Sequence, residues 1–245
     1  MGSVATAFAI LETVGEQQPV GVSDIARALG IPKTTTHRML QELRALGWIR
    51  GSGGDDAPRW SLTSKVLTLA GQVAAASDVR QQALPAMHEL NARTGETIHL
   101  TVPEDGHVVL LDKVDSTHAV RAWSWVGGRA PIHATSSGKA ILACLPEDEV
   151  RALLSSGLEQ YTAFTHTDVE TLLQELEQVR SRGYALNPGE WRADVAACGA
   201  AVLDSDGRPV AALSISMPRH RFPEEKWAPY GALVRDAALA ASGRG

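Results

Sequence analysis

The chain has 245 residues, of which 44% are hydrophobic and 21% are charged, so we expect one or two globular domains rather than a collagen-like or disordered chain. Its longest apolar run, residues 195–203, is much shorter than the roughly 18 residues of a membrane span, and its first residues lack the pattern of a signal peptide. Two cysteines are too few for a disulfide framework or a CxxC metal cage, so we expect a cytoplasmic protein with reduced thiols and no membrane contact.

The charges are unevenly distributed along the chain. Residues 1–63 contain six of the 23 basic and six of the 28 acidic residues, so this part is neutral and the rest carries the formal net charge of −5. Within the neutral part, residues 33–50 hold four basic side chains and His37 against a single acidic one, Glu42. A local basic surface is the electrostatic signature of nucleic-acid binding. The sequence therefore indicates such a surface near the amino end.

Three helices are predicted first. Apolar residues recur at helical spacing over residues 4–14. Ser23 is expected to cap a short helix over residues 24–29, which Gly30 would end. A third helix is expected over residues 33–45, because its apolar side chains again follow the helical period.

The second and third of these helices have the form of a helix-turn-helix motif. Two short helices joined by a glycine-containing turn place the second one in the major groove of DNA. Residues 48–50 and 59–62, on either side of the glycine-rich tip 51–57, predict a β-hairpin that would form a wing. Alternatively, such amphipathic helices with exposed arginines occur in many small helical domains. The side chains expected to contact DNA are Ser23, Lys33, Thr34, Thr35, His37, Arg38, Arg50 and Arg59.

Residues 23–40, which read Ser-Asp-Ile-Ala-Arg-Ala-Leu-Gly-Ile-Pro-Lys-Thr-Thr-Thr-His-Arg-Met-Leu, and residues 46–49 resemble the winged helix of the isocitrate lyase regulator (IclR) family of bacterial transcription factors. The resemblance implies an α+β fold with an N-terminal winged helix-turn-helix domain at residues 1–63. A linker helix at residues 64–77 would help to pair two subunits, and a larger GAF-like α/β effector-binding domain would follow at residues 78–245. Further similar motifs occur, in the family's order and spacing, at residues 94–100, 111–114, 127–140, 179–185 and 211–216.

The second part of the chain alternates strands and helices. A helical pattern over residues 62–93 breaks near residues 74–78, and Pro85 is expected in a first turn or at a bend, because proline inside a helix costs about 3 kcal/mol. Thr167 and Glu170 have the spacing of a capping box. The predicted strands are residues 97–102, 108–114, 119–126, 197–203 and 210–217, and the predicted helices are residues 137–144, 146–154, 168–182 and 224–241.

The run of small residues at 135–140 is the most chemically suggestive segment outside the helix-turn-helix. It imitates the end of a phosphate-binding loop, but His133 stands where that loop needs glycine, and Ala140 stands where it needs serine or threonine. Free backbone amides at a helix N-terminus would suit a carboxylate. The alternative is a serine that only caps its own helix. The resemblance places effector contacts at Ser136 and Ser137.

Other residues are candidates for the same site. Ser214 and Ser216 alternate along a strand and share one face, where they either bond to neighbouring backbone or line a cavity, and the resemblance favours the cavity. Asn187 stands where relatives carry an acidic residue. Trp123 and Trp125 would share one side of their strand, in a pocket or at a subunit contact. The expected effector-binding residues are Ala122, Ser136, Ser137, Gly138, Asn187, Ser214 and Ser216.

The sequence contains no pattern typical of an enzyme. There is no GxSxG turn and no HExxH helix, and the eight histidines are dispersed. Cys198 lies among small apolar residues and is expected to be a buried thiol rather than a nucleophile. His133 is expected to have a structural role. We therefore expect no catalytic residue, no metal ligand and no cofactor.

The predicted function is that of a DNA-binding transcriptional repressor that a small organic acid, amide or aromatic effector releases from its operator. A homodimer, or a homotetramer of two dimers, would present two third helices about 34 Å apart to a roughly palindromic double-stranded operator. One alternative is a ligand-binding enzyme or sensor whose winged helix mediates protein contacts only. The other is a DNA-binding protein with a vestigial pocket.

Overall fold

Two compact units make up the chain. Tertiary contacts divide it into Met1–Ala76 and Ser77–Gly245, and each unit encloses its own apolar core, as separate folding units do. None of the helices in the described part of the chain is both long and apolar enough to cross a membrane. The structure, a computed structural model, describes residues 2–53, 58–75, 78–122 and 124–243.

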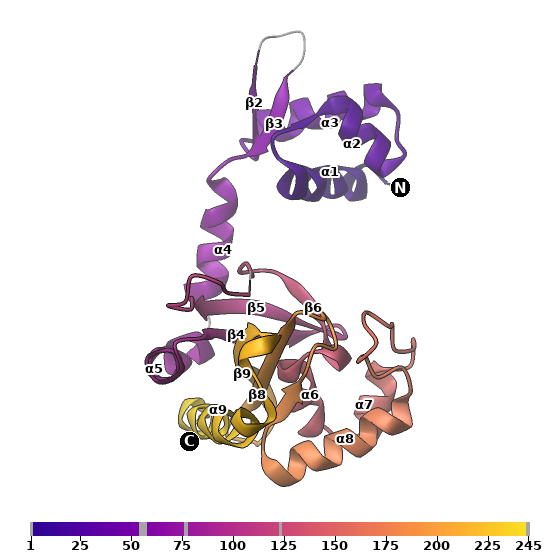
Figure 1. Cartoon of the computed structure of the whole chain (residues 1–245). Helices are drawn as coiled ribbons and strands as arrows, with labels where there is room; N and C mark the ends of the chain where they lie inside the picture. The colour runs from indigo at the N-terminus through magenta and orange to yellow at the C-terminus, as the bar shows by residue number, and fades with distance from the viewer. Residues whose placement is uncertain (1, 54–57, 76–77, 123, 244–245) are drawn as a thin grey trace. The chain divides into compact units, whose positions relative to one another are not determined.

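The first unit is a winged helix-turn-helix, as predicted (Figure 1). Three helices pack on a small antiparallel sheet, and Ile10, Leu40 and Trp60 are fully buried in the core between them. The tip of the hairpin, residues 54–57, lies outside the described residues. The elements are α1 (Ser3–Gln17), β1 (Val20–Gly21), α2 (Val22–Leu29), α3 (Lys33–Ala45), β2 (Ile49–Ser52), β3 (Arg59–Leu62) and α4 (Lys65–Ala75), and the strand order is β1-β3-β2.

Helix α2 ends as predicted but begins at a different residue. Gly30 adopts the left-handed conformation (φ +63°) and its amide donates to the last turn of α2, so it ends that helix. Ser23, however, is not the N-cap. The short strand β1 pairs Val20 with Trp60, and the chain passes directly from this strand into α2 with Gly21 at the N-cap position.

A six-stranded antiparallel sheet in the order β6-β5-β4-β9-β8-β7 forms the centre of the second unit. The strands are β4 (Thr97–Glu104), β5 (His107–Val114), β6 (Arg129–Pro131), β7 (Ala185–Asn187), β8 (Val195–Leu203) and β9 (Pro209–Pro218). The helices are α5 (Asp78–Thr94), α6 (Ser136–Ala143), α7 (Glu147–Leu153), α8 (Val169–Arg182) and α9 (Trp227–Ala241), with 3-10 turns at Ile132–Ala134, Arg219–Arg221 and Glu224–Lys226.

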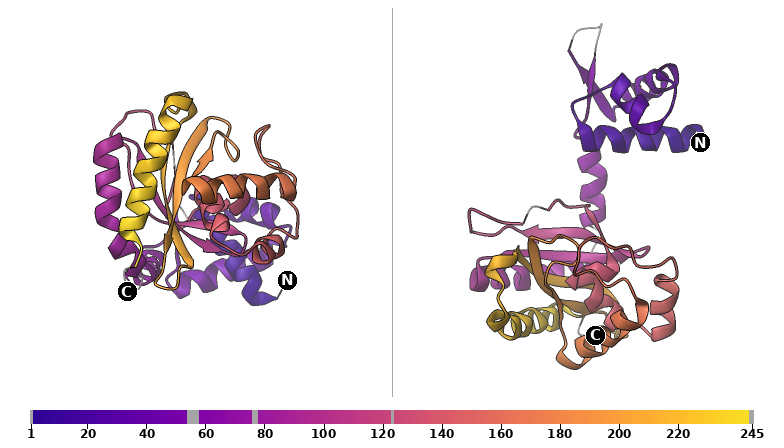
Figure 2. Two further views of the ribbon diagram at one scale, coloured as in Figure 1. Left: turned by 90° about the horizontal axis from the view of Figure 1, so that it is seen from below. Right: turned by 45° about the vertical axis from the view of Figure 1, so that its right-hand side comes forward.

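Helices cover both faces of this sheet. α5 and α9 lie side by side on one face, and α6, α7 and α8 lie on the other (Figure 2). Alternation along β4 places Ile98 and Leu100 in the core beneath α5 and α9. His99 and Thr101 project to the opposite side, where they line a pocket. The α/β character predicted for this part of the chain is confirmed.

The strand predicted over residues 119–126 is absent. The described residues of this segment are irregular, and β5 pairs at this edge with β6 instead. Gly127 has φ +85° and donates its amide to the carbonyl of Leu110 at 2.7 Å, so the chain reaches the sheet only after this turn. The segment owes its mixed apolar and polar pattern to a pocket that it lines at Ala122, Ser124 and Trp125.

Two predicted details of the helices are wrong. Pro85 lies inside α5 rather than in its first turn or at a bend. It faces solvent, so water can satisfy the carbonyl that the missing amide leaves without a partner. Asp168, not Thr167, caps α8, and its carboxylate accepts from the amide of Thr171 at 2.8 Å. Aspartate is the stronger N-cap because its charge also favours the positive end of the helix.

Candidate functional site

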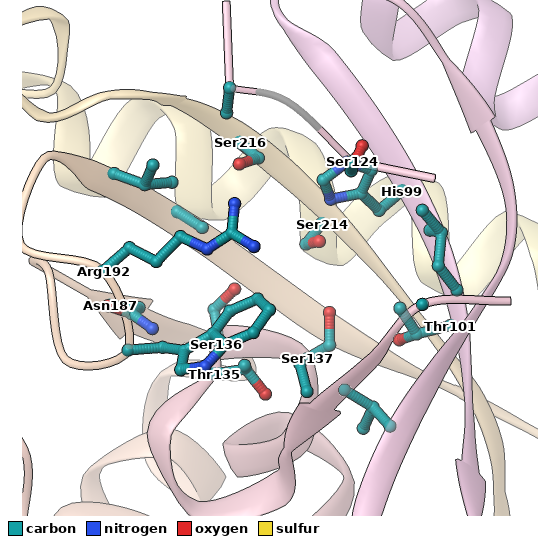
Figure 3. Close-up of a pocket in the computed structure, with 18 of the residues that line it drawn as sticks. His99, Thr101, Ser124, Thr135, Ser136, Ser137, Asn187, Arg192, Ser214 and Ser216 are labelled. Atoms are coloured by element: carbon teal, nitrogen blue, oxygen red, sulfur yellow. The ribbon is translucent and has the colours of Figure 1, made fainter. Parts of the chain in front are cut away.

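A pocket opens on the sheet face that carries α6 (Figure 3). The register of β4, β9 and β8 places His99, Ser214 and Gly199 side by side, and Ser216 lies beside Ala197 in the next row on the same face. Ser214 and Ser216 therefore share one face, as predicted, and that face lines the cavity. The empty space of the pocket is about 800 Å³ when its open mouth is included.

The N-terminus of α6 forms one wall of the pocket. Thr135 is its N-cap, and the threonine hydroxyl accepts from the amide of Gly138 at 3.1 Å. The cap is therefore not a serine, and Ser136 and Ser137 both line the pocket. The helix can sit this close because β8 has a glycine beneath it: a Cβ on Gly199 would lie 3.1 Å from backbone atoms of both serines.

Gly138 is the one predicted effector-binding residue outside the pocket lining. A Cβ at this position would lie only 2.0 Å from the carbonyl oxygen of Ile132. The glycine is therefore needed for close packing of the turn that precedes α6. The structure brings the other six predicted residues together around one cavity: Ala122, Ser136, Ser137, Asn187, Ser214 and Ser216.

The segment that links β7 to β8, residues 187–192, forms a second wall. Asn187 is buried, and its Nδ2 donates to the carbonyl of Ala134 at 2.7 Å. Its Oδ1 accepts from the amides of Gly189 and Glu190 at 2.9 and 2.8 Å. Both lone pairs of the side-chain carbonyl are then occupied, so Asn187 shapes the wall and can offer a ligand only an amide hydrogen.

Two residues that sequence reasoning missed, Trp191 and Arg192, complete this wall. The guanidinium of Arg192 lies 4.4 Å from the centre of the Trp191 ring, and its side chain extends toward the pocket (Figure 3). Arg129 also lines the pocket and forms an ion pair with Glu104 at 3.1 Å. The lining in the described part of the chain contains these two arginines and a histidine but no carboxylate. Its charge balance therefore suits an anionic ligand.

His99 is a further lining residue that was not predicted. Its Nε2 lies 2.9 Å from Oγ of Ser124. Burial, with a smaller contribution from the charge of Lys113, lowers the pKa of His99 from its ordinary value of 6.5 to about 4. The imidazole is therefore neutral at neutral pH. The alternation of Thr97, His99 and Thr101 along a predicted strand is the sequence signal that could have indicated a polar wall.

Residues 115–122 and 124–128, here called the strap, line one side of the pocket at Ala122, Ser124, Trp125 and Gly128. The guanidinium of Arg221 holds the strap by donating to the carbonyl of Val120 at 2.8 Å. The same side chain forms an ion pair with the buried carboxylate of Glu96 at 2.6 Å. Trp125 lines the pocket while 49% of its surface is exposed, and its predicted companion Trp123 lies outside the described residues.

The polar face of α3 is open to solvent. Lys33, Thr34, His37 and Arg38 are exposed, and Thr35 is half-buried. This face is opposite the buried stripe of Thr36, Met39, Leu40 and Leu43, which anchors the helix in the core. Thr34, His37 and Arg38 therefore point away from the core, as predicted, and Thr35 is only partly exposed.

The remaining residues of the predicted DNA-binding surface lie outside α3. Arg50 is exposed on β2, and Ser23 is half-buried in the first turn of α2. Arg59 is exposed on β3, but its Nη2 donates to the carbonyl of Pro19 at 2.7 Å and so also holds the entry to β1. Arg38 forms an exposed ion pair with Glu42 at 2.8 Å, which is weak enough to exchange for another anion.

The two cysteines and His133 lie in environments that suit a structural role. Cys198 is fully buried, and burial raises the pKa of its thiol well above the ordinary value. Burial likewise raises the pKa of Cys144. His133 is buried with its Nε2 3.0 Å from the carbonyl oxygen of Glu159. The cysteines therefore lack the lowered pKa that nucleophilic thiols require.

One cluster within the described ranges has the composition of a metal site. His166, Glu175 and Glu190 bring potential ligand atoms within 4.8 Å of one another. The ammonium group of Lys139 already contacts both carboxylates, at 2.7 Å from Glu175 and closer still to Glu190. A cation of the protein itself therefore occupies the position that a metal ion would take.

Comparisons with known proteins cover both units. Residues 71–243 match the family model for the bacterial transcriptional regulator IclR C-terminal domain, and residues 3–53 match the model for the IclR helix-turn-helix domain. The chain is 34% identical over 240 residues to the HTH-type transcriptional regulator KdgR of Escherichia coli K12, spanning 97% of this chain and 90% of KdgR. It is also 34% identical over 227 residues to the HTH-type transcriptional repressor AllR of the same strain, spanning 89% and 80% of the two chains.

A solved structure with a bound small molecule is similar over the whole chain. It is an IclR homologue from Microbacterium hydrocarbonoxydans in complex with 4-hydroxybenzoate. The two proteins are 32% identical with a TM-score of 0.79, and the match covers 98% of each chain. The relatives and the matched families are transcriptional regulators rather than enzymes.

Proposed function

Because the chain belongs to the IclR family of bacterial transcriptional regulators, we propose that it is a cytoplasmic repressor. A small organic anion would bind to it and lower its affinity for the operator. The one observation that carries the proposal is a pocket lined by two arginines and several hydroxyl groups, in a unit distinct from a winged helix-turn-helix. The alternative of an enzyme or sensor is not favoured, because the family and the relatives are regulators.

The effector class follows from the chemistry of the pocket wall. Arg192 can form a bidentate pair with a carboxylate, and the amide end of α6 beside Ser136 and Ser137 favours the same charge. Trp125 and Trp191 offer apolar faces to a ring. An aromatic carboxylic acid satisfies both halves of the pocket. The 4-hydroxybenzoate bound by the Microbacterium relative supports this class.

The proposed DNA contacts are those predicted from the sequence. Lys33, Thr34, Thr35, His37 and Arg38 of α3 would meet bases and phosphates, while Arg50 and Arg59 of the wing would add salt-sensitive phosphate contacts. Their support is the exposed polar face of α3 and its basic charge. Ser23, in the first turn of α2, would contact the DNA backbone next to α2.

We assign the winged domain to residues 1–63, the linker helix to residues 64–77 and the effector domain to residues 78–245. Two linker helices would pair in a homodimer, which could associate further into a homotetramer. Support comes from α4, where Leu67 is 71% exposed and Leu69 is 50% exposed, because large apolar side chains in solvent mark contact surfaces. A two-fold dimer requires a roughly palindromic operator with half-sites about 34 Å apart or a multiple of that distance.

The effector proposal is tested by a thermal shift screen of carboxylic acids, with 4-hydroxybenzoate as the first probe and the matching amides as controls. An acid at 100 times its Kd should stabilise the second unit by about 2.7 kcal/mol. The same acid should release the protein from DNA of its own upstream region in a fluorescence anisotropy assay. If amides stabilise the protein as well as the acids do, the anionic effector class is wrong.

The DNA-binding proposal is tested by replacing Thr35 and Arg38 together by alanine. The double variant should lose sequence-specific binding in a gel shift, and the salt dependence of the remaining binding should fall by about one unit of slope because one phosphate contact is gone. Arg44→Ala, at the other end of α3, is the matched control and should bind nearly as the wild type does. Loss of acid-induced stabilisation in the double variant would contradict a DNA surface that is separate from the pocket.

A further inference from the structure

The second unit contains a fully buried lysine whose charge has no role in the pocket lining. The side chain of Lys139 is 0% exposed, and its Nζ donates to Oε1 of Glu175 at 2.7 Å and to Oε1 of Glu190 at a shorter distance. Glu190 is only 2% exposed. Burying the two charged groups of Lys139 and Glu190 is costly unless they are paired, so this contact has a specific structural consequence.

The contact between Lys139 and Glu190 joins two walls of the pocket. Lys139 lies on α6, one turn after Ser136 and Ser137, which line the cavity. Glu190 belongs to the segment between β7 and β8, two residues before Arg192. An ion pair behind the lining therefore spans from the wall with the helix amides to the wall with the guanidinium group.

Neighbouring hydrogen bonds hold the same segment near Glu190. The hydroxyl of Thr162 donates to the carbonyl of Gly189 at 2.8 Å, and the hydroxyl of Thr165 donates to the carbonyl of Glu190. These bonds fix the backbone of the segment, whereas the Lys139 contact is the one that reaches α6 through the Glu190 side chain. Burial raises the pKa of the Glu190 carboxyl, and the nearby charge of Lys139 opposes that shift.

The other partner of Lys139 has no connection to the pocket. Glu175 lies on α8, where its Oε2 is 2.6 Å from Nε2 of His166. Burial opposes ionisation of Glu175, but the hydrogen bond from His166 and the charge of Lys139 prevail and lower its pKa to about 2. Glu175 and Glu190 thus neutralise the same ammonium group. Glu190 does so from the segment between β7 and β8, which carries pocket residues, and Glu175 from α8, which does not. This makes Glu175 a matched control for Glu190.

We propose that the Lys139–Glu190 contact is a positioning device that holds Arg192 and Trp191 at a set distance from the N-terminus of α6. Neither residue of the contact touches the effector. The contact instead determines how well the pocket prefers a carboxylate over the matching amide, since that preference depends on Arg192 and the helix amides facing the same group. The inference deepens the proposed function and rests on it.

The test compares Glu190→Gln with Glu175→Gln in the full-length protein. Each variant removes one carboxylate charge beside Lys139 and keeps the side-chain volume. Calorimetry gives Kd for 4-hydroxybenzoate and for 4-hydroxybenzamide. Glu190→Gln should raise the Kd of the acid about tenfold and leave the Kd of the amide within threefold, so the ratio of the acid Kd to the amide Kd rises. Glu175→Gln should keep the wild-type ratio, even if its melting temperature drops as much as that of Glu190→Gln.

A readout without any ligand separates failure of this inference from failure of the proposed function. Hydrogen exchange of a peptide spanning residues 187–195 should be faster in Glu190→Gln than in Glu175→Gln. Equal exchange in the two variants, or an equal change in their acid-to-amide ratio, would overturn the inference. If the wild type binds neither probe, the aromatic-acid proposal fails, and the exchange comparison still decides whether the contact holds the segment.

A conservative variant keeps the test decisive if Glu190→Gln does not fold. Glu190→Asp retains the charge but shortens the side chain by one methylene, so the ion pair is stretched rather than removed. Its acid-to-amide ratio and its exchange rates should lie between those of the wild type and those expected for the broken contact. If this variant keeps both the wild-type ratio and the wild-type exchange rates, the side-chain length at position 190 does not matter, which would count against the proposed role of the contact.

Discussion

Single residues determine the charge and the hydrogen-bonding character of the pocket. Arg192 supplies a cation to its wall, and His99 supplies a neutral imidazole, because burial lowers the pKa of His99 to about 4. The side chain of Asn187 forms three hydrogen bonds to backbone groups. We therefore expect ligand choice to depend mainly on Arg192 and the hydroxyl groups, with Asn187 shaping the wall beside them.

Replacing Arg192 by glutamine should weaken binding of an aromatic acid about 10- to 100-fold, because a hydrogen bond to a charged group is worth about 1.5–3 kcal/mol. Binding of the corresponding amide should change little. Calorimetry on both ligands gives the comparison. Arg219→Gln serves as the control, since Arg219 lies over the Phe164 ring outside this pocket. Equal losses for acid and amide would show that Arg192 does not meet the carboxylate.

The pKa of His99 predicts a pH dependence of stability. The folded pKa of about 4 lies below the ordinary value of 6.5, so the unfolded chain binds more protons between these values. The contribution of His99 is fully present above pH 6.5 and is lost as the pH falls toward 4, by about 3 kcal/mol. Urea unfolding of the wild type and of His99→Asn across this range measures it. Parallel curves for the two proteins would contradict the shifted pKa.

At the scale of elements, the pocket exists because the N-terminus of α6 lies directly on β8. Gly199 permits this contact, and Gly138 permits the tight turn before the helix. Arg221 holds the strap beside the cavity through the carbonyl of Val120, and the strap bonds to β5 at Gly127 and Gly128. A helix N-terminus, a sheet face and an irregular segment together make the walls.

Replacing Gly199 by alanine tests the close approach of α6. The added Cβ would lie 3.1 Å from atoms of Ser136 and Ser137, so the helix must move by a few tenths of an ångström, at a cost of about 1–3 kcal/mol. Urea unfolding should show this loss, and acid affinity should fall with it. Gly71→Ala on α4 meets no atom within 4 Å and should be neutral or stabilising. Unchanged stability in Gly199→Ala would mean that α6 adapts freely.

At the scale of the whole molecule, the chain combines a DNA-reading unit with a ligand-binding unit. An effector can change DNA binding only by the difference in its affinity for the two functional states of the protein. The two units communicate in a dimer if paired linker helices set the spacing of the two α3 helices. In the proposed dimer, the exposed apolar side chains of α4 would provide the surface for that pairing.

Replacing Leu67 and Leu69 together by glutamate should therefore convert the dimer into a monomer, because the charges would be buried without partners at the contact. Sedimentation velocity gives the oligomeric state. Operator affinity should fall at least 100-fold, since one half-site no longer assists the other. Leu153→Glu on α7 is the control, as it places one charge on another exposed leucine. A double variant that stays dimeric would assign the interface to another surface.

Much of the first unit could be predicted because its signals are local. Gly30 in the left-handed conformation ends α2, and the apolar period of α3 leaves its polar face outside. The misassigned cap at Ser23 has a non-local cause, since the pairing of Val20 with Trp60 determines where α2 begins. The strand predicted over residues 119–126 is wrong for a related reason: a pocket wall and a sheet strand share the same alternation of side chains.

The sequence by itself determined the fold class, the winged helix-turn-helix and most of the strands and helices along the chain, because helical period and glycine turns act over a few residues. Six of the seven effector-binding residues predicted from it line the pocket. Only the tertiary structure decided that His99, Arg192 and the start of α6 face one cavity, and that Lys139 joins two of its walls. These groups meet through antiparallel register and close helix packing, which depend on contacts between segments far apart in the chain.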